Sequence, residues 1–156
     1  MNFSTWPQII TALAAVLSAV VGPVAAYFIA RKQIRANLVS ANRQKWIDAI
    51  RDDVSEFLTV WDKFSGLLTK RSKEGYFDND KDINEFFESH YRMEFLFTRI
   101  KLRLNPGDRN HNTLLEMIEA LMKSERSGSG LELPNRIVDW TQHILKAEWD
   151  RLKSLK

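Results

Sequence analysis

The sequence contains no cysteine, and its first 30 residues contain no charged side chain and no histidine. The absence of cysteine excludes disulfides, thiolate nucleophiles and cysteine-ligated metals, and it suits a reducing cytoplasm. All 23 basic and all 20 acidic residues follow position 30, so the average of 28% charged residues hides two unlike parts. The part after position 30 is long enough for one domain with its own hydrophobic core and too short for two.

Motifs that carry chemistry are also scarce. The chain has three histidines and lacks the G-x-S-x-G, P-loop, H-E-x-x-H and kinase signatures. His90 falls on an apolar helical face without a second ligand nearby, so a packed histidine is a simpler interpretation than a metal ligand. The carboxylates are scattered over helix faces. We therefore expect no catalytic residue, no metal site and no cofactor, and a binding function rather than an enzyme.

One apolar stretch dominates the N-terminal part. Residues 9–30 form a run of 22 uncharged, mostly apolar residues, which as a helix would be about 33 Å long and match a bilayer core. A buried helix of a soluble protein would show a polar face, and a signal peptide would begin with basic residues. The sequence therefore predicts a transmembrane helix, with a signal peptide and a buried soluble helix as alternatives. Thr5-x-x-Gln8 resembles a capping box and, with Pro7 in the first turn, predicts where the helix begins.

Positive charge follows this stretch at once. Arg31, Lys32 and Arg35 come directly after it, and no acidic residue precedes Asp48. Because basic residues stay on the cytoplasmic side of a span, we expect a single-pass protein of the bacterial inner membrane with its N-terminus outside. The three cations are expected at the lipid headgroups of the bilayer. The predicted organisation is a transmembrane anchor at 1–30, a basic juxtamembrane stalk at 31–45 and a cytoplasmic helical domain at 46–156.

Two features inside the apolar stretch predict how it packs. Small residues recur at spacings of 3, 4, 3 and 4, at Ala12, Ala15, Ala19, Gly22 and Ala26. Such a stripe lets helix backbones approach closely in a membrane and predicts self-association, although alanine-rich spans without a partner are also common. Gly22 and Pro23 form the predicted hinge, because proline loosens the inner half of the helix.

Helical periodicity continues beyond the apolar stretch. Apolar side chains alternate steps of three and four at Ile47, Ile50, Val54, Phe57, Trp61, Phe64 and Leu68. This stripe predicts either the core-facing side of a small bundle or an oligomeric coiled coil, and its bulky Phe and Trp residues favour the bundle. A loop is expected at 70–82, followed by a helix over 83–104 that Asp82 and Glu85 cap.

Two further helices complete the predicted domain. A Pro-Gly pair at 106–107 ends the second helix, and the next helix has three alternative caps: Thr113 with Glu116, Asp108, or Asn112. A polar loop at 123–130 and a last helix over 134–155 follow. No stretch alternates with the period of a β-strand. We therefore expect an all-α protein, with one transmembrane helix followed by a cytoplasmic bundle of about four helices.

Basic side chains gather near the predicted loops. The candidate nucleotide-binding set is Arg99, Lys101, Arg103, Arg109, His111 and Arg126. Together with the RSGSG stretch, such groups suit a phosphorylated ligand, and DNA is not expected as a partner. Each cation also has a simpler explanation, because the helix dipole favours cations at a C-terminal end and charged runs are commonly solvated.

Two stretches resemble those of known bacterial proteins. Residues 40–58 contain N-R-Q-x-W-I-x-x-I-R, and residues 99–121 contain L-N-P followed by His and Leu. These blocks are similar to those of a widespread group of small single-span bacterial membrane proteins, most of which have no assigned function. The resemblance covers most of the chain after residue 40 and supports the architecture more than an activity.

A looser resemblance concerns size and layout. The chain is similar in plan to a membrane effector of type III CRISPR systems, in which a membrane segment precedes a cytoplasmic helical domain. That resemblance implies antiviral defence by a homo-oligomer, a tetramer in that kind of protein, that binds cyclic tetra-adenylate and perturbs its membrane segment or opens a pore. No binding residue carries over by motif. The alternative hypothesis is a membrane-tethered protein-interaction module, such as a phage exclusion factor or a scaffold.

Overall fold

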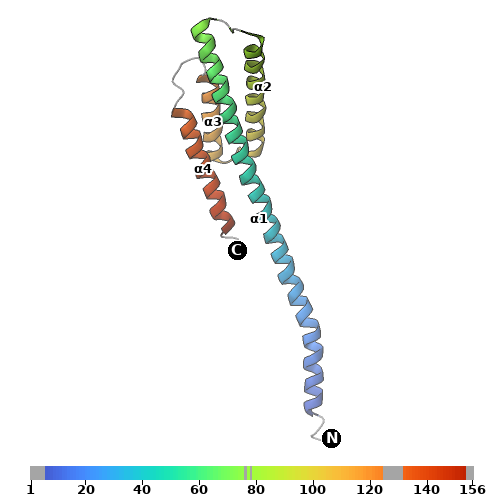
Figure 1. Cartoon of the computed structure of the whole chain (residues 1–156). Helices are drawn as coiled ribbons and strands as arrows, with labels where there is room; N and C mark the ends of the chain where they lie inside the picture. The colour runs from blue at the N-terminus through green and yellow to red at the C-terminus, as the bar shows by residue number, and fades with distance from the viewer. Residues whose placement is uncertain (1–5, 76, 78, 125–131, 154–156) are drawn as a thin grey trace. The chain divides into compact units, whose positions relative to one another are not determined.

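The computed structural model describes residues 6–75, 77, 79–124 and 132–153, and within them it contains four α-helices and no strand (Figure 1). The helices are α1 (Trp6–Glu74), α2 (Asp80–Arg103), α3 (Arg109–Lys123) and α4 (Glu132–Lys153). The predicted all-α fold, an apolar N-terminal helix followed by a helical bundle, is confirmed. The chain divides into two compact units, one reaching Asn42 and the other beginning at Arg43.

The first unit is the N-terminal part of α1. Its most apolar 18-residue window has a mean hydropathy of 2.3, and none of that window is buried within the structure. Large side chains such as Val16, Leu17 and Phe28 are 62–63% exposed. The hydroxyls of Thr11 and Ser18 each donate to the backbone carbonyl four residues earlier, at 2.8 Å, so they need no water. By length and composition, this part of α1 can span a membrane.

Three sequence predictions fall on this unit. Thr5 lies outside the described residues and the side chain of Gln8 is not described, so the capping box stays a prediction. Helix α1 continues through Pro23 without interruption, and the hinge stays a prediction as well. A Cβ atom added at Gly22 would meet nothing within 4 Å, so the small-residue stripe is open along this part of the helix.

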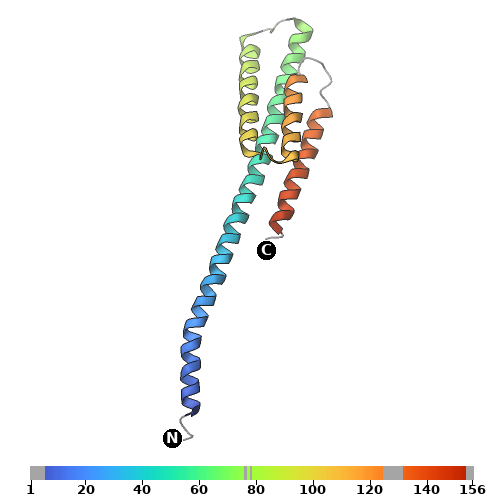
Figure 2. The same ribbon diagram turned by 180° about the vertical axis from the view of Figure 1, so that it is seen from behind.

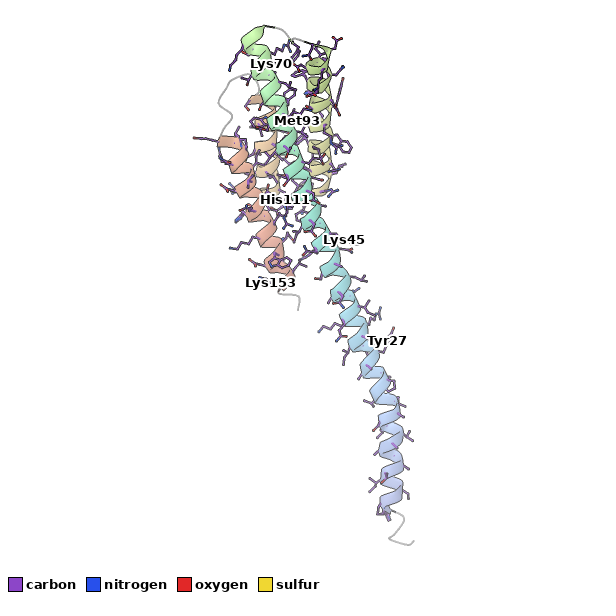
Figure 3. All side chains as sticks on the ribbon, viewed as in Figure 1. Tyr27, Lys45, Lys70, Met93, His111 and Lys153 are labelled. Atoms are coloured by element: carbon purple, nitrogen blue, oxygen red, sulfur yellow. The ribbon has the colours of Figure 1, made fainter. Side chains whose placement is uncertain are left out.

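The second unit is a helical bundle with a continuous apolar core. The part of α1 in this unit contributes the predicted stripe, with five side chains at most 3% exposed: Ile47, Ile50, Val54, Phe57 and Phe64. The other helices bury Met93, Leu96, Ile100, Leu114, Ile118, Leu121, Ile137 and Ile144 against it. In Figures 1 and 2, α1 lies between α2 on one side and α3 with α4 on the other, and Figure 3 marks Met93 within this bundle. The stripe therefore packs inside its own chain, as the bundle interpretation predicted.

The connection between α1 and α2 is shorter than the sequence predicted. The predicted loop at 70–82 is wrong at both ends, because α1 continues to Glu74 and α2 begins at Asp80. The predicted cap is also wrong: the N-cap is Asn79, whose side-chain oxygen accepts from the backbone N–H of Asp82 at 2.9 Å. The carboxylate of Asp82 instead pairs with Lys70 Nζ at 2.5 Å and ties the end of α1 to the start of α2.

One of the three N-caps that the sequence predicted for α3 is present in the turn between α2 and α3. Asp108 is the N-cap of α3 and accepts from the backbone N–H of Asn110 at 2.8 Å. Thr113 lies inside the helix, where its hydroxyl donates to the Arg109 carbonyl at 3.0 Å. Helix α3 then packs against α4, which begins two residues before the predicted position 134.

Candidate functional site: a buried carboxylate between α1 and α2

A charged side chain occupies the apolar face of α1. Asp53 is 2% exposed, between the buried Ile50 and Val54. An uncompensated carboxylate at such a position would cost several kcal/mol, so its partners decide whether the fold is stable.

Two arginines from α2 compensate this charge. Arg99 Nη2 donates a hydrogen bond to Asp53 Oδ1. Arg103 Nε lies 3.1 Å from Asp53 Oδ2 and forms an ion pair with it, but Oδ2 accepts no hydrogen bond. The two arginines are four residues apart, so they share the face of α2 that meets α1. The carboxylate of Asp53 raises the pKa of Arg99 above its ordinary value through their hydrogen bond. Arg99 therefore stays charged throughout the pH range in which proteins are studied.

The charge network continues along the α1–α2 contact. Arg92 donates to Glu56 Oε1, and Arg99 Nη2 lies 3.4 Å from Glu56 Oε2. The guanidinium carbons of Arg92 and Arg99 lie 5.2 and 5.4 Å from the centre of the Phe95 ring. Two acidic residues of α1 thus meet three basic residues of α2, and the network fixes the register of the two helices.

The same end of the bundle contains a second set of contacts. Trp46 Nε1 donates to the backbone carbonyl of Arg103 at 2.8 Å, and the Trp46 ring lies 5.8 Å from the ring of His111. His111 is buried, and its Nδ1 accepts from the backbone N–H of Asn105 at 2.9 Å (Figure 3). In α4, Trp140 Nε1 donates to the Asn110 carbonyl at 2.9 Å. These bonds hold the α2–α3 turn against α1 and α4.

The stretches 40–58 and 99–121, on which the expected resemblance rests, meet in space. Trp46 and Asp53 come from the stretch 40–58, and Arg99, Arg103 and His111 come from the stretch 99–121. Their side chains bind one another, so the contact between the blocks has a structural use that requires no ligand.

The structure separates the six residues of the predicted nucleotide-binding set. Arg99, Arg103 and His111 have partners within the chain. Lys101 lies about 200° around α2 from each arginine, on a different face, and Arg109 is exposed at the start of α3. Arg126 lies outside the described residues. The set as a ligand site stays a prediction, and Lys101 and Arg109 are its exposed members.

The predicted lipid contacts lie on the first unit. Arg31, Lys32 and Arg35 are exposed, and their spacing places them on one face of α1 with Phe28. An apolar ring next to three cations suits the boundary between hydrocarbon and headgroups. His90, in α2, is half-buried with its ring 5.8 Å from that of Phe64, as a packed histidine would be.

Sequence reasoning missed Asp53, Glu56 and Trp46 as members of this site. The signal for Asp53 was present, because a residue three after Ile50 and four before Phe57 falls on the buried face of the helix. Across the part of the chain that the structure describes, no group of three His, Asp or Glu side chains could hold a metal ion. Comparison with known protein families, curated proteins and solved structures gave no match.

Proposed function

We propose that the protein is a membrane-tethered binding module, with the apolar part of α1 (residues 9–30) as a single-pass anchor and residues 43–154, which include the C-terminal part of α1, as a cytoplasmic helical domain. The observation that carries the proposal is the apolar part of α1, in which every large side chain that is described is at least half exposed. Burial of one such side chain is worth about 1.5–3 kcal/mol, so transfer of the whole segment into hydrocarbon is worth on the order of 15 kcal/mol. The three cations at 31, 32 and 35 then favour a cytoplasmic position for the helical domain.

The proposal assigns binding rather than catalysis to the helical domain. Its buried charges are paired with one another, and Trp46, His111 and Trp140 use their ring nitrogens in contacts that hold the turn. Such groups support a rigid surface, and the exposed side chains of that surface supply the contact with a partner.

The anchor is tested by fractionation of the full-length chain. We expect the protein in the membrane pellet, resistant to extraction at alkaline pH. A fourfold variant, Leu13→Lys, Val16→Lys, Val20→Lys and Val24→Lys, should move to the soluble fraction. Four charges in the segment cost about 10–14 kcal/mol on insertion scales, and the loss of four large apolar side chains removes about 6–12 kcal/mol of the transfer gain. The matched control is Val138→Lys, an exposed valine of α4, which should leave the distribution unchanged.

Two results would contradict the anchor. A soluble full-length protein would show that the segment is covered by protein instead of lipid. A mature chain that has lost residues 1–30, measured by intact mass, would show that the segment is a cleaved signal.

A ligand-gated antiviral effector is the more specific form of this proposal. It uses the same anchor and domain and adds a cyclic oligoadenylate as ligand. Because Arg99 and Arg103 hold Asp53, the phosphates would have to meet Lys101 and Arg109 first. Calorimetry of the full chain in detergent with cyclic tetra-adenylate tests this. Binding that Lys101→Ala and Arg109→Ala abolish, and that Lys146→Ala leaves intact, supports the gated form, whereas no binding leaves a module without this ligand.

A further inference from the structure

Helix α2 is apolar on two opposite faces. One face is the core face of Met93, Leu96 and Ile100, which are fully buried. The other face is exposed and carries the residues that we name the outer stripe: Phe87 (50% exposed), Tyr91 (70%), Phe95 (52%), Leu102 (82%) and the exposed Thr98. Their spacing of 4, 4, 3 and 4 places all five within a sector about 80° wide, opposite the core face.

The outer stripe differs from ordinary surface apolar residues. A bundle helix normally presents a polar face to water, and scattered exposed apolar side chains need no explanation. Here four large side chains follow one another along a single helix, and the nearest described charges are the guanidinium groups of Arg92 and Arg99, which lie against the Phe95 ring from one edge. Contiguous apolar surface of this kind marks a site of interaction.

We propose that the outer stripe packs against the outer stripe of a second copy of the chain. This inference rests on the proposed membrane tether, because two anchored copies share one surface and one orientation. Residues 91, 95, 98 and 102 follow the 4-3-4 spacing of a two-helix seam. A second copy presents the same uncharged seam, so the two surfaces are complementary by symmetry.

The charges beside the outer stripe agree with this occupant. Glu94 and Lys101 lie beside one edge of the stripe, and Glu88, Arg92 and Arg99 lie beside the other. Within the described part of the chain, Glu94 is exposed and has no ion-pair partner. In a parallel pair of α2 helices, Glu94 of one copy would face Arg99 of the other, as residues five apart do in coiled coils. The Arg99 side chain is 32% exposed and would meet Glu94 while it still holds Asp53 and Glu56 of its own chain.

The exposed apolar area of the outer stripe is too small for a stable dimer in dilute solution but sufficient for a pair of membrane-anchored copies. Four large side chains that are half exposed or more supply roughly 400 Å² per copy, from the size of aromatic side chains. A stable interface in solution buries about 800 Å² on each partner. The outer stripe alone therefore gives a weak pair, which anchoring strengthens by raising the effective concentration.

Disulfide cross-linking of the full chain in isolated membranes tests the proposal directly, because the natural sequence has no cysteine. Thr98→Cys introduces one thiol at the centre of the outer stripe, and Gln142→Cys introduces one at an exposed position of α4. Under mild oxidation, we expect a covalent dimer for Thr98→Cys at least fivefold above that for Gln142→Cys. Adding Leu102→Glu should return the yield to the control level, whereas adding Val138→Glu should not.

The outcomes separate this inference from the proposed function. Membrane-bound protein with equal cross-linking at both positions would overturn the inference and leave the tether intact. Dimers that persist with Leu102→Glu would also overturn it, because the contact would then lie elsewhere. Protein in the soluble fraction would overturn the tether, on which the inference depends. Leu102 is 82% exposed, so its substitution leaves the core undisturbed and keeps the test interpretable.

Discussion

Removal of the Asp53 carboxylate should destabilise the helical domain more than removal of any exposed acid. Breaking a buried ion pair costs about 3–5 kcal/mol when the remaining charge stays buried. The side chains of Arg99 and Arg103 are 32% and 33% exposed, so after Asp53→Ala they regain part of their hydration. We therefore expect a loss of about 2–3 kcal/mol, in the upper part of the range of about 1.5–3 kcal/mol for hydrogen bonds to charged groups. For a domain of this size, the loss corresponds to a lowering of Tm on the order of 10 °C.

Asp53→Asn removes the negative charge of the side chain while keeping its size. The amide keeps the volume and one acceptor oxygen, so the expected loss is smaller, about 1–2 kcal/mol. The matched control is Asp52→Ala, which removes an exposed carboxylate one position away and should change the free energy of unfolding by less than about 0.5 kcal/mol.

The assay is urea unfolding of the full-length chain in a mild detergent, followed by far-UV circular dichroism and tryptophan fluorescence. Coupling between the two partners is also expected: a double-mutant cycle of Asp53→Asn with Arg103→Gln should give an interaction energy of at least about 0.5 kcal/mol. Equal stabilities for Asp53→Ala and Asp52→Ala would refute the reasoning, since the buried network would then contribute nothing.

Three further predictions concern the ends of the helices. Trp46→Phe keeps the ring against His111 and loses the bond to the Arg103 carbonyl, so it should cost about 1 kcal/mol in the same unfolding assay. Asn79→Ala removes the side-chain acceptor at the N-cap of α2 and should lower the free energy of unfolding by about 1 kcal/mol, whereas Asn79→Asp keeps an acceptor and should retain most of the stability. An equal loss of stability in the two variants would show that this acceptor does not stabilise α2. The backbone N–H of Asn110 lowers the pKa of Asp108 below its ordinary value of 3.8, so the carboxylate stabilises α3 above that pH and its contribution disappears as the pH falls through the lowered pKa. Asp108→Asn should therefore weaken the acid dependence of stability between pH 5 and 2, measured as Tm against pH, and an unchanged dependence would contradict this assignment.

The helices themselves were predictable because their apolar periodicity is regular. The stripe from Ile47 to Phe64 identifies the buried face of α1, and the structure places the same residues in the core. The helix ends were less predictable. The stretch before α2 offers several Asx side chains, and any of them can accept a backbone N–H, so local sequence does not decide between Asn79 and Asp82.

The site was predictable only in part. The basic character of Arg99 and Arg103 was evident, but their use depends on Asp53, which is 46 and 50 residues away in sequence. Helical periodicity also indicated the inner side of α2, because Met93, Ile100 and Leu104 recur at helical spacing and are buried. It did not single out the opposite face, which is apolar as well. The packing of α2 on α1 identifies the outer stripe as the exposed face.

The position of α1 in the membrane is the central claim, and cysteine accessibility in intact cells tests it most directly. Single thiols at Leu17 and Asn37 would be treated with a membrane-impermeant maleimide before and after permeabilisation of the inner membrane. The account predicts that Leu17→Cys stays unlabelled throughout and that Asn37→Cys is labelled only after permeabilisation. Labelling of Leu17→Cys in folded protein, or of Asn37→Cys in intact spheroplasts, would contradict a single span with a cytoplasmic domain.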